Sequence, residues 1–201
     1  LADISVDYIG HYGSDDVIVN AARVSFDKEA SGYTTEQNAK LLKYLATHKH
    51  FSPFNHTFVS LRIKAPIFVA RQLGKHRFMP WNEVSRRYVD DEPEFYIPSL
   101  RMKADNVKQG SSEELMPGMW EQSAKEHMKN MLAYYTAAVA SGMAPEVARA
   151  FLPQNMMTTW YWSGTLGAYC DMLRLRLDPH TQAESRIVAE KVKEIITPLF
   201  P

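Results

Sequence analysis

The sequence predicts one domain in which β-strands and α-helices are mixed. Residues 4–11 and 57–65 alternate apolar with polar side chains, the period of two that a half-buried strand shows. Residues 34–47 combine a capping signal with an apolar stripe, which is typical of a surface helix. The 201 residues contain no composition break, repeat or linker, so residues 1–201 are expected to form a single domain.

The elements of the first half follow from local signals. Acidic residues at Asp15 and Asp16 suit the first turn of a helix, and Thr34 with Gln37 has the spacing of a capping box. Pro66 favours a helix start and Gly74 a helix end, and the residues between them have almost no polar face, which indicates burial. The expected elements are a strand at 4–11, helices at 15–26 and 34–47, a strand at 57–65 and a helix at 66–74.

The second half contains more helix. Gly142 is the expected end of a long helix, and a short helix from Pro145 carries Arg149 near its end. Thr181 and Glu184 have capping-box spacing for the last helix, whereas residues 99–118 are polar and irregular, with a capped turn at 111–114. The expected elements are a short strand at 94–97, a helix at 120–141, a strand at 157–162 and helices at 166–177 and 181–196.

The composition is that of a soluble globular protein, with 45% hydrophobic and 23% charged residues. Lys plus Arg and Asp plus Glu each number 23, and the resulting zero net charge argues against a general nucleic-acid partner. No apolar run approaches the about 18 residues of a membrane span, and the start of the chain lacks a signal-peptide pattern. We therefore expect a cytoplasmic protein with neither a nucleic-acid nor a membrane partner.

Metal and thiol chemistry are both weakly supported. Three histidines, His48, His50 and His56, invite a zinc interpretation and with it a metal-dependent hydrolase, but no fourth ligand or helical glutamate accompanies them. Pro53 makes this segment a shaped loop of the kind that carries function. Cys170 is the only cysteine and lies in an apolar, helix-like run, which indicates a buried side chain and a poor nucleophile. We expect no metal site.

The segment Gln72–Tyr88 concentrates cations and aromatic rings. Guanidinium groups bind phosphates and flat rings stack on heterocycles, so the segment suits a nucleotide-like ligand, although a solvated basic loop has the same composition. Arginines elsewhere in the chain could converge on it, whereas dinucleotide, P-loop and hydrolase-elbow motifs do not occur. Its cationic residues are Lys75, His76, Arg77, Arg86 and Arg87, and the separate arginines are Arg149, Arg174 and Arg176.

Within that segment, KHRFMPWNEVSRRY closely resembles the signature of the flavin-dependent thymidylate synthases. A basic residue, His and Arg are followed by seven residues and a serine, and then by two arginines and a tyrosine. Further blocks similar to the family occur in the same order along nearly the whole chain. They are AARVSFD, HKHFSPFNH, KAPIFVARQ, EFYIP, PEVARAFLP and LRLDPHTQAE.

The resemblance implies an α+β fold with an antiparallel sheet and long helices, assembled as a homotetramer with sites between subunits. It implies methylation of dUMP to dTMP, with methylenetetrahydrofolate as carbon donor and with FAD, recharged by NADPH, as hydride donor. No cysteine nucleophile is used in the family, which agrees with the poor context of Cys170. On the residues alone, a non-catalytic nucleotide- or RNA-binding module remains the alternative.

The resemblance also assigns residues to ligands. Arg176 faces the pyrimidine and is the expected catalytic residue, and Arg87 with Arg149 can hold the phosphate. Ser85 has no histidine base beside it in sequence, so we expect it to bind rather than attack. The expected dUMP ligands are Gln72, Glu83, Ser85, Arg86, Arg87, Arg149 and Arg176. The expected FAD ligands are His50, Ser52, Lys75, His76, Arg77, Asn82, Glu83, Thr165, Gly167 and Asp171, with Ser52 coming from a neighbouring subunit.

Three positions depart from the family pattern. Lys75 stands where an arginine is usual, so the charge is kept and the bidentate fork is lost. Gly167 stands where an arginine is found, and Asn55 where a glutamate is common. These changes bear on ligand affinity rather than on the chemistry itself.

Overall fold

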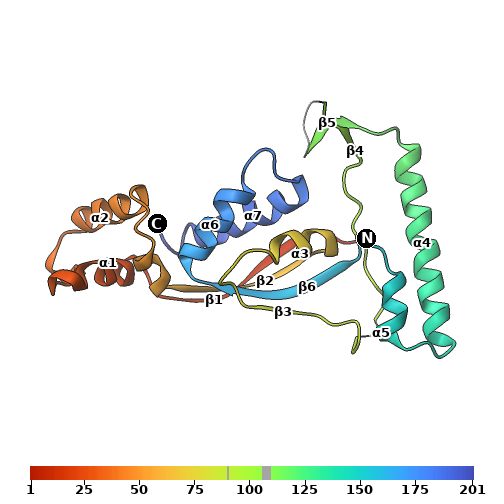
Figure 1. Cartoon of the computed structure of the whole chain (residues 1–201), viewed down its shortest axis with the longest axis horizontal. Helices are drawn as coiled ribbons and strands as arrows, with labels where there is room; N and C mark the ends of the chain where they lie inside the picture. Colours follow the sequence, from red (N-terminus) through yellow and green to blue (C-terminus); the bar gives the residue numbers. More distant parts are fainter. Residues whose placement is uncertain (90, 106–109) are drawn as a thin grey trace.

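A four-stranded antiparallel sheet forms the centre of the computed structural model, which describes residues 1–89, 91–105 and 110–201. Its strand order is β1-β2-β6-β3, so strands distant in sequence become neighbours. Figure 1 shows helices α3, α6 and α7 over one face of this sheet. The strands are β1 (Ser5–Tyr12), β2 (Phe58–Pro66), β3 (Trp81–Glu83) and β6 (Met157–Gly164).

The remaining elements extend from the two ends of the sheet. In Figure 1, α1 and α2 lie at one end, and the long helix α4 lies with α5 at the other. A separate two-stranded ladder joins β4 and β5. The elements are α1 (Asp15–Arg23), α2 (Thr35–Thr47), α3 (Ile67–Leu73), β4 (Arg101–Lys103), β5 (Ser111–Leu115), α4 (Met119–Ala140), α5 (Pro145–Ala148), α6 (Leu166–Arg176), α7 (Ala183–Ile196) and the 3₁₀ segments η1 (Val24–Phe26), η2 (Ala30–Gly32), η3 (Ser52–His56) and η4 (Arg149–Phe151).

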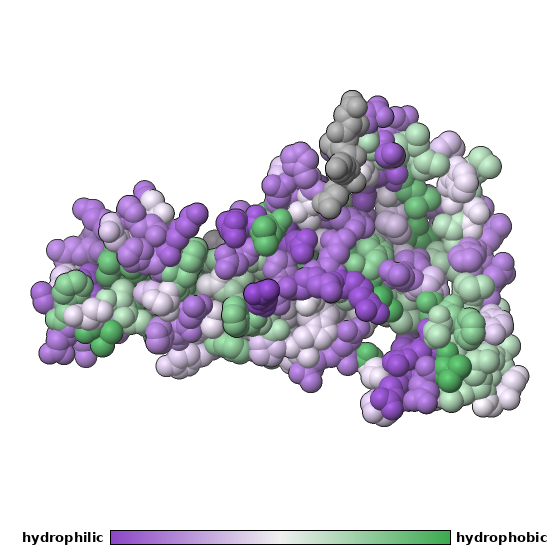
Figure 2. All heavy atoms as spheres, viewed as in Figure 1, coloured by the Kyte–Doolittle hydropathy of each residue, from purple (hydrophilic) through white to green (hydrophobic). Residues whose placement is uncertain are grey.

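The core forms between the sheet and the three helices that cover it. Val59, Leu61 and Ile63 of β2 are fully buried, and the intervening residues of the strand are not, which confirms the alternation predicted from sequence. Trp160 and Trp162 of β6 lie on the same buried face. A smaller cluster around Phe95, Met128 and Met156 attaches α4 to the end of the sheet. Figure 2 shows mainly hydrophilic residues on the surface, with hydrophobic ones gathered at the end that carries α4.

Several local signals are confirmed. The Thr34 hydroxyl accepts from the Gln37 N–H at 3.3 Å, and the Gln37 side chain accepts from the Thr34 N–H at 2.9 Å, which completes the capping box of α2. The long helix α4 ends just before Gly142, whose φ of 92° is one that glycine adopts without strain. Among the described residues, no helix is both long and apolar enough to span a membrane.

Other predictions are wrong. Residues 94–97 form no strand; Phe95 makes a single bridge with Met156. Within 99–118, the described part forms the β4–β5 ladder, so the capped turn at 111–114 does not exist, and residues 106–109 lie outside the described residues. Gln182, not Thr181, is the N-cap of α7, because the Thr181 hydroxyl donates to the Leu175 carbonyl at 2.9 Å.

Cys170 is exposed, so its predicted burial is also wrong. The protein around the sulfur still desolvates it and, with the nearby Asp171, raises the pKa of the thiol. The thiolate is therefore disfavoured, as the sequence context suggests.

Candidate active site

Arg176, the last residue of α6, is the centre of the best-defined polar cluster. Its Nε donates to His76 Nε2 at 2.9 Å, and its Nη2 donates to the main-chain oxygen of Gln72 at 3.2 Å. This cluster brings together residues from three separate segments, which are the end of α3, the signature and the end of α6. Since His76 Nε2 accepts a hydrogen bond, the imidazole is neutral in this geometry. Burial and then the charge of Arg176 lower the pKa of His76, while Asp171 raises it.

The Gln72 side chain is fixed by the start of α7. Its Oε1 accepts from the Ser185 hydroxyl at 2.8 Å, and its Nε2 donates to Gln182 Oε1. Ser185 is fully buried, so the serine end of this contact is rigid. Gln182 and Ser185 are polar residues that sequence reasoning missed, although Gln182 belongs to the block LRLDPHTQAE.

Glu83 lies at the edge of the sheet, on β3. Its Oε1 accepts from the Thr158 hydroxyl at 2.7 Å, and its Oε2 accepts from Trp81 Nε1 at 3.0 Å. Trp81 stacks on Trp160 with ring centroids 4.4 Å apart, so the contact that orients Glu83 is itself anchored to the core. Asn82 is exposed between them.

Arg87 and Arg149 each contact Glu146. Arg87 Nε lies 3.4 Å from Glu146 Oε2, and Arg149 Nε donates to the Glu146 main-chain oxygen at 3.3 Å. Arg87 thus contacts the Glu146 carboxylate, and Arg149 contacts the main chain of the same residue. In the same segment, the Ser85 hydroxyl accepts from the Arg87 N–H at 3.3 Å, and Arg86 donates to the main-chain oxygen of Asp91.

The remaining signature cations are open to solvent. Lys75 and Arg77 are exposed on either side of the half-buried His76, and within the described ranges neither forms an ion pair. Such cations suit the pyrophosphate of a dinucleotide cofactor. Asp171 is also exposed and lies 3.4 Å from Arg174 on the same helix face, so Arg174 has a carboxylate partner rather than only the helix dipole.

The histidine loop meets the start of α6 through Asn55, which is not one of the predicted flavin residues. Ser52 is exposed at the first position of η3. From the same segment, Asn55 Oδ1 accepts from the Thr165 hydroxyl at 2.8 Å, and the adjacent Gly167 is buried. The centroid of the His50 ring lies 6.0 Å from that of Tyr44 and 6.5 Å from that of His48. In the part of the chain that the structure describes, no three His, Cys, Asp or Glu side chains are grouped as metal ligands would be.

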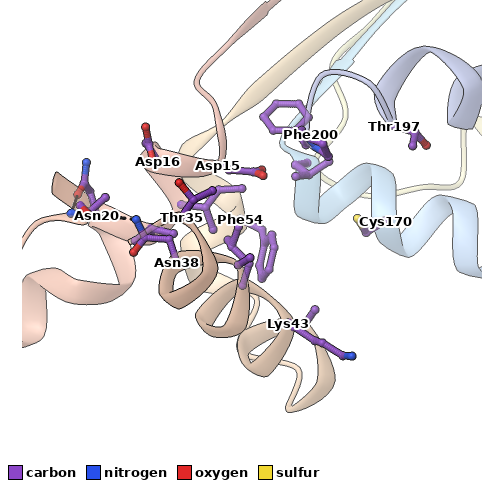
Figure 3. A pocket seen from close by; sticks show the side chains of 18 of the residues that line it. Asp15, Asp16, Asn20, Thr35, Asn38, Lys43, Phe54, Cys170, Thr197 and Phe200 are labelled. Carbon is purple, nitrogen blue, oxygen red and sulfur yellow. Dashed lines mark hydrogen bonds between the residues drawn. The ribbon is translucent and has the colours of Figure 1, made fainter. Parts of the chain in front are cut away.

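A large hollow of about 960 Å³ lies on the other flank of α6 (Figure 3). Leu166, Cys170, Leu173 and Leu177 form its α6 wall, a stripe different from the one that carries Gly167 and Asp171. Apart from Cys170, the labelled residues in Figure 3 come from α1, α2, η3 and the C-terminal end, and they include none of the predicted site residues. The hollow is thus separate from the arginine clusters, and its size alone does not make it the active site.

Comparison with known proteins identifies the family of the chain. The family model described as thymidylate synthase complementing protein matches residues 7–201. Proteins named flavin-dependent thymidylate synthase are 37% identical to the chain in Treponema denticola (96% of this chain, 75% of the relative) and in Wolbachia pipientis (98% and 69%). The same name and identity apply to a Thermus thermophilus protein, with 96% and 71% covered. The chain therefore belongs to the flavin-dependent thymidylate synthase family, as its signature predicts.

A solved structure has the same fold. It is a UMP/dUMP methylase, PolB from Streptomyces cacaoi, bound with 5-Br dUMP, and it is 29% identical to the chain. The TM-score is 0.88, over 100% of this chain and 93% of the other. The mixed α/β fold with an antiparallel sheet, expected from the resemblance, is confirmed.

Proposed function

We propose that the chain catalyses the reductive methylation of dUMP to dTMP as a flavoenzyme. The observation that carries this proposal is the cluster in which His76 and Gln72 orient the Arg176 guanidinium. An oriented guanidinium can recognise the flat polar edge of a pyrimidine. The names of the relatives and the nucleotide bound to the solved methylase point to the same substrate.

The overall reaction determines which substrates and cofactors the enzyme must bind. The uracil C5–H is replaced by a methyl group, and methylenetetrahydrofolate gives up its methylene carbon and becomes tetrahydrofolate. Because a methyl group is more reduced than a methylene donor by two electrons, a hydride source is required. FAD, when reduced by NADPH, supplies that hydride and is itself returned to the oxidised state.

Arg176 acts on the pyrimidine. Its guanidinium stabilises negative charge that develops on the N3–O2 edge of uracil, which makes C5 more nucleophilic toward the carbon donor. A neutral His76 can orient Arg176 because its Nε2 accepts from the guanidinium, whereas an imidazolium would have no free lone pair to do so. Gln72 and Glu83, each held by two hydrogen bonds, complete the base-recognition groups.

Arg87 and Arg149 bind the phosphate of dUMP. Arg87 pairs with the exposed Glu146 carboxylate, which a phosphate can replace as its anionic partner, and Arg149 contacts the main-chain oxygen of the same residue. The segment that holds Ser85 and Arg86 supplies further donors. Ser85 binds the nucleotide rather than attacking it, since its hydroxyl contacts the Arg87 N–H and no base.

The flavin is held by exposed groups around the signature and the start of α6. Lys75 and Arg77 fit its pyrophosphate because they are unpaired cations within the described part of the chain. Thr165 and Asp171 on α6 and Asn82 on β3 offer polar contacts. The remaining proposed flavin ligands are His50, Ser52, His76, Glu83 and Gly167.

The complete site forms between subunits of a homotetramer in the cytoplasm. Arg149 follows α5, Arg176 ends α6, and Figure 1 shows these helices in different regions of the protomer. One dUMP molecule that contacts both arginines therefore takes them from two copies of the chain. Ser52 reaches the flavin of a neighbouring copy in the same assembly.

The test is an assay of the purified chain with dUMP, methylenetetrahydrofolate, NADPH and FAD. We expect dTMP formation that requires all four, together with flavin absorbance that stays with the protein. UMP is included in place of dUMP, because the solved methylase is named for both nucleotides. Absence of both flavin binding and dTMP would contradict the proposal. Salt-sensitive oligonucleotide binding without a flavin requirement would instead support a nucleotide- or RNA-binding module.

A further inference from the structure

Two segments proposed to bind flavin, η3 and the start of α6, are connected by a side-chain hydrogen bond. Thr165, the N-cap of α6, donates its hydroxyl to Asn55 Oδ1 at 2.8 Å and accepts the Ala168 N–H at 3.2 Å. One hydroxyl thus caps the helix and ties η3 to it. Asn55 lies three residues after Ser52, so its position sets where that part of the loop stands relative to α6.

Gly167 makes this close approach possible. A Cβ at this position would lie 2.5 Å from Asn55 Oδ1 and 3.7 Å from Phe54 Cβ. The first distance is too short for any real contact, whereas the second is ordinary packing. The glycine is not needed for its backbone angles, since its φ is not positive. What it provides is room for the Asn55 side chain.

We infer that Asn55 is a positioning residue for flavin binding, held by Thr165 in a space that Gly167 keeps open. The inference rests on the proposed function, because it assigns the contact a role in holding the cofactor. The atom that a Cβ would meet is the end of a side chain, so an alanine at 167 displaces Asn55 rather than the backbone. Gly167→Ala and Asn55→Ala therefore remove the same hydrogen bond.

The test is a double-mutant cycle on FAD affinity, measured by fluorescence quenching of the full-length protein. Asn55→Ala and Gly167→Ala should each weaken FAD binding about fivefold, the equivalent of one hydrogen bond. The double variant should be no weaker than either single variant, because Gly167→Ala has nothing left to displace once Asn55 is truncated. Gly118→Ala is the matched control, since a Cβ there meets nothing within 4 Å.

Thermal unfolding separates this role from simple structural support. Gly167→Ala should change the midpoint little, since the greater helix propensity of alanine offsets the hydrogen bond that is lost. Three results would overturn this inference while leaving the proposed function intact. They are additive losses of FAD affinity in the double variant, unchanged FAD affinity in both single variants, and a lower melting midpoint without a change in FAD affinity. A wild-type protein that binds no FAD and forms no dTMP would overturn the proposed function, and this role with it.

Discussion

The Arg176 guanidinium is oriented by two acceptors of its own chain, His76 and the Gln72 carbonyl. The position of Arg176 near the end of a predicted helix allows two interpretations. The side chain could complement the helix dipole, or it could belong to a ligand site. Contacts across 100 and 104 residues of chain favour the second. No local pattern could have predicted them, because the partners are adjacent only after the sheet has formed.

Replacing Arg176 with alanine should abolish most turnover. Removal of one preorganised group that stabilises developing charge typically lowers kcat by about a hundredfold or more. FAD affinity should change little, because the proposed role is at the uracil. Stopped-flow flavin oxidation and FAD titration measure the two separately. Turnover equal to that of wild type would refute the assignment.

Ser85→Ala should raise KM for dUMP several-fold and leave measurable kcat. The lost hydroxyl contributes one hydrogen bond in the proposed phosphate site, which corresponds to about a fivefold effect. Steady-state kinetics at saturating dUMP distinguishes this from a nucleophile. Complete loss of turnover, with folding and dUMP binding intact, would restore the nucleophile interpretation.

His76 makes stability depend on pH in a defined direction. Its pKa in the folded state is lowered from 6.5, first by burial and then by Arg176. The unfolded chain therefore binds a proton that the folded chain excludes, and the free energy of unfolding falls as pH decreases below 6.5. Thermal melts from pH 8 to 5 should show this decline, and it should be smaller in His76→Gln. Identical slopes for the two proteins would contradict this prediction.

At the scale of elements, prediction succeeded where the signal is local. The strands β2 and β6 and the helices α2 and α4 carry their own periodicity or caps, and all are present. The strand β3 has three residues, too few to show a period. The ladder of β4 and β5 is polar on most sides, so its alternation is invisible in the sequence.

An ion pair attaches the β4–β5 ladder to α7. Arg101 of β4 contacts Glu184 of α7 at 2.7 Å, and the Glu184 side chain is 1% exposed. Its second oxygen, Oε2, has no hydrogen-bond partner among the described residues. A buried carboxylate with only one partner depends strongly on that partner.

Arg101→Ala should therefore destabilise the protein by about 3 kcal/mol, because Glu184 would be left buried and unpaired. Urea denaturation followed by circular dichroism measures the change. Adding Glu184→Gln should recover part of the loss, since the amide carries no charge to desolvate. Lys103→Ala, at an exposed position of the same strand, is the control and should change stability little.

At the scale of the whole molecule, the sequence proposed a set of site residues but could not show how they are grouped. Asn55 and Gly167 stand as two unrelated departures from the family pattern in the sequence, yet a Cβ at position 167 would lie 2.5 Å from Asn55 Oδ1. Glu146 contacts Arg87 and, through its main-chain oxygen, Arg149, without belonging to the signature. Such relations depend on how segments pack, and a site shared between subunits depends on further surfaces that no single segment encodes.

Mixed assemblies test whether the site is shared. Arg149→Ala and Arg176→Ala should each be nearly inactive alone. If one site takes these arginines from different subunits, roughly a quarter of the sites in randomly mixed tetramers regain both. Denaturing and refolding the two variants together, followed by the dTMP assay, measures this recovery. No recovery in tetramers shown by mass to be mixed would place both arginines in one subunit.

The outer strands of the sheet have a consequence for solubility. In the order β1-β2-β6-β3, the strands β1 and β3 are outermost, and an outermost strand can recruit a strand from another molecule. The pairing of β1 with β2 changes register between Tyr8 and Gly10, and β3 spans only three residues. A register break bends the backbone away from a straight template, and a three-residue strand offers few donors and acceptors. Both borders are therefore poor seeds for amyloid-like growth, even though Tyr8, Ile9 and Tyr12 leave β1 with an exposed apolar surface.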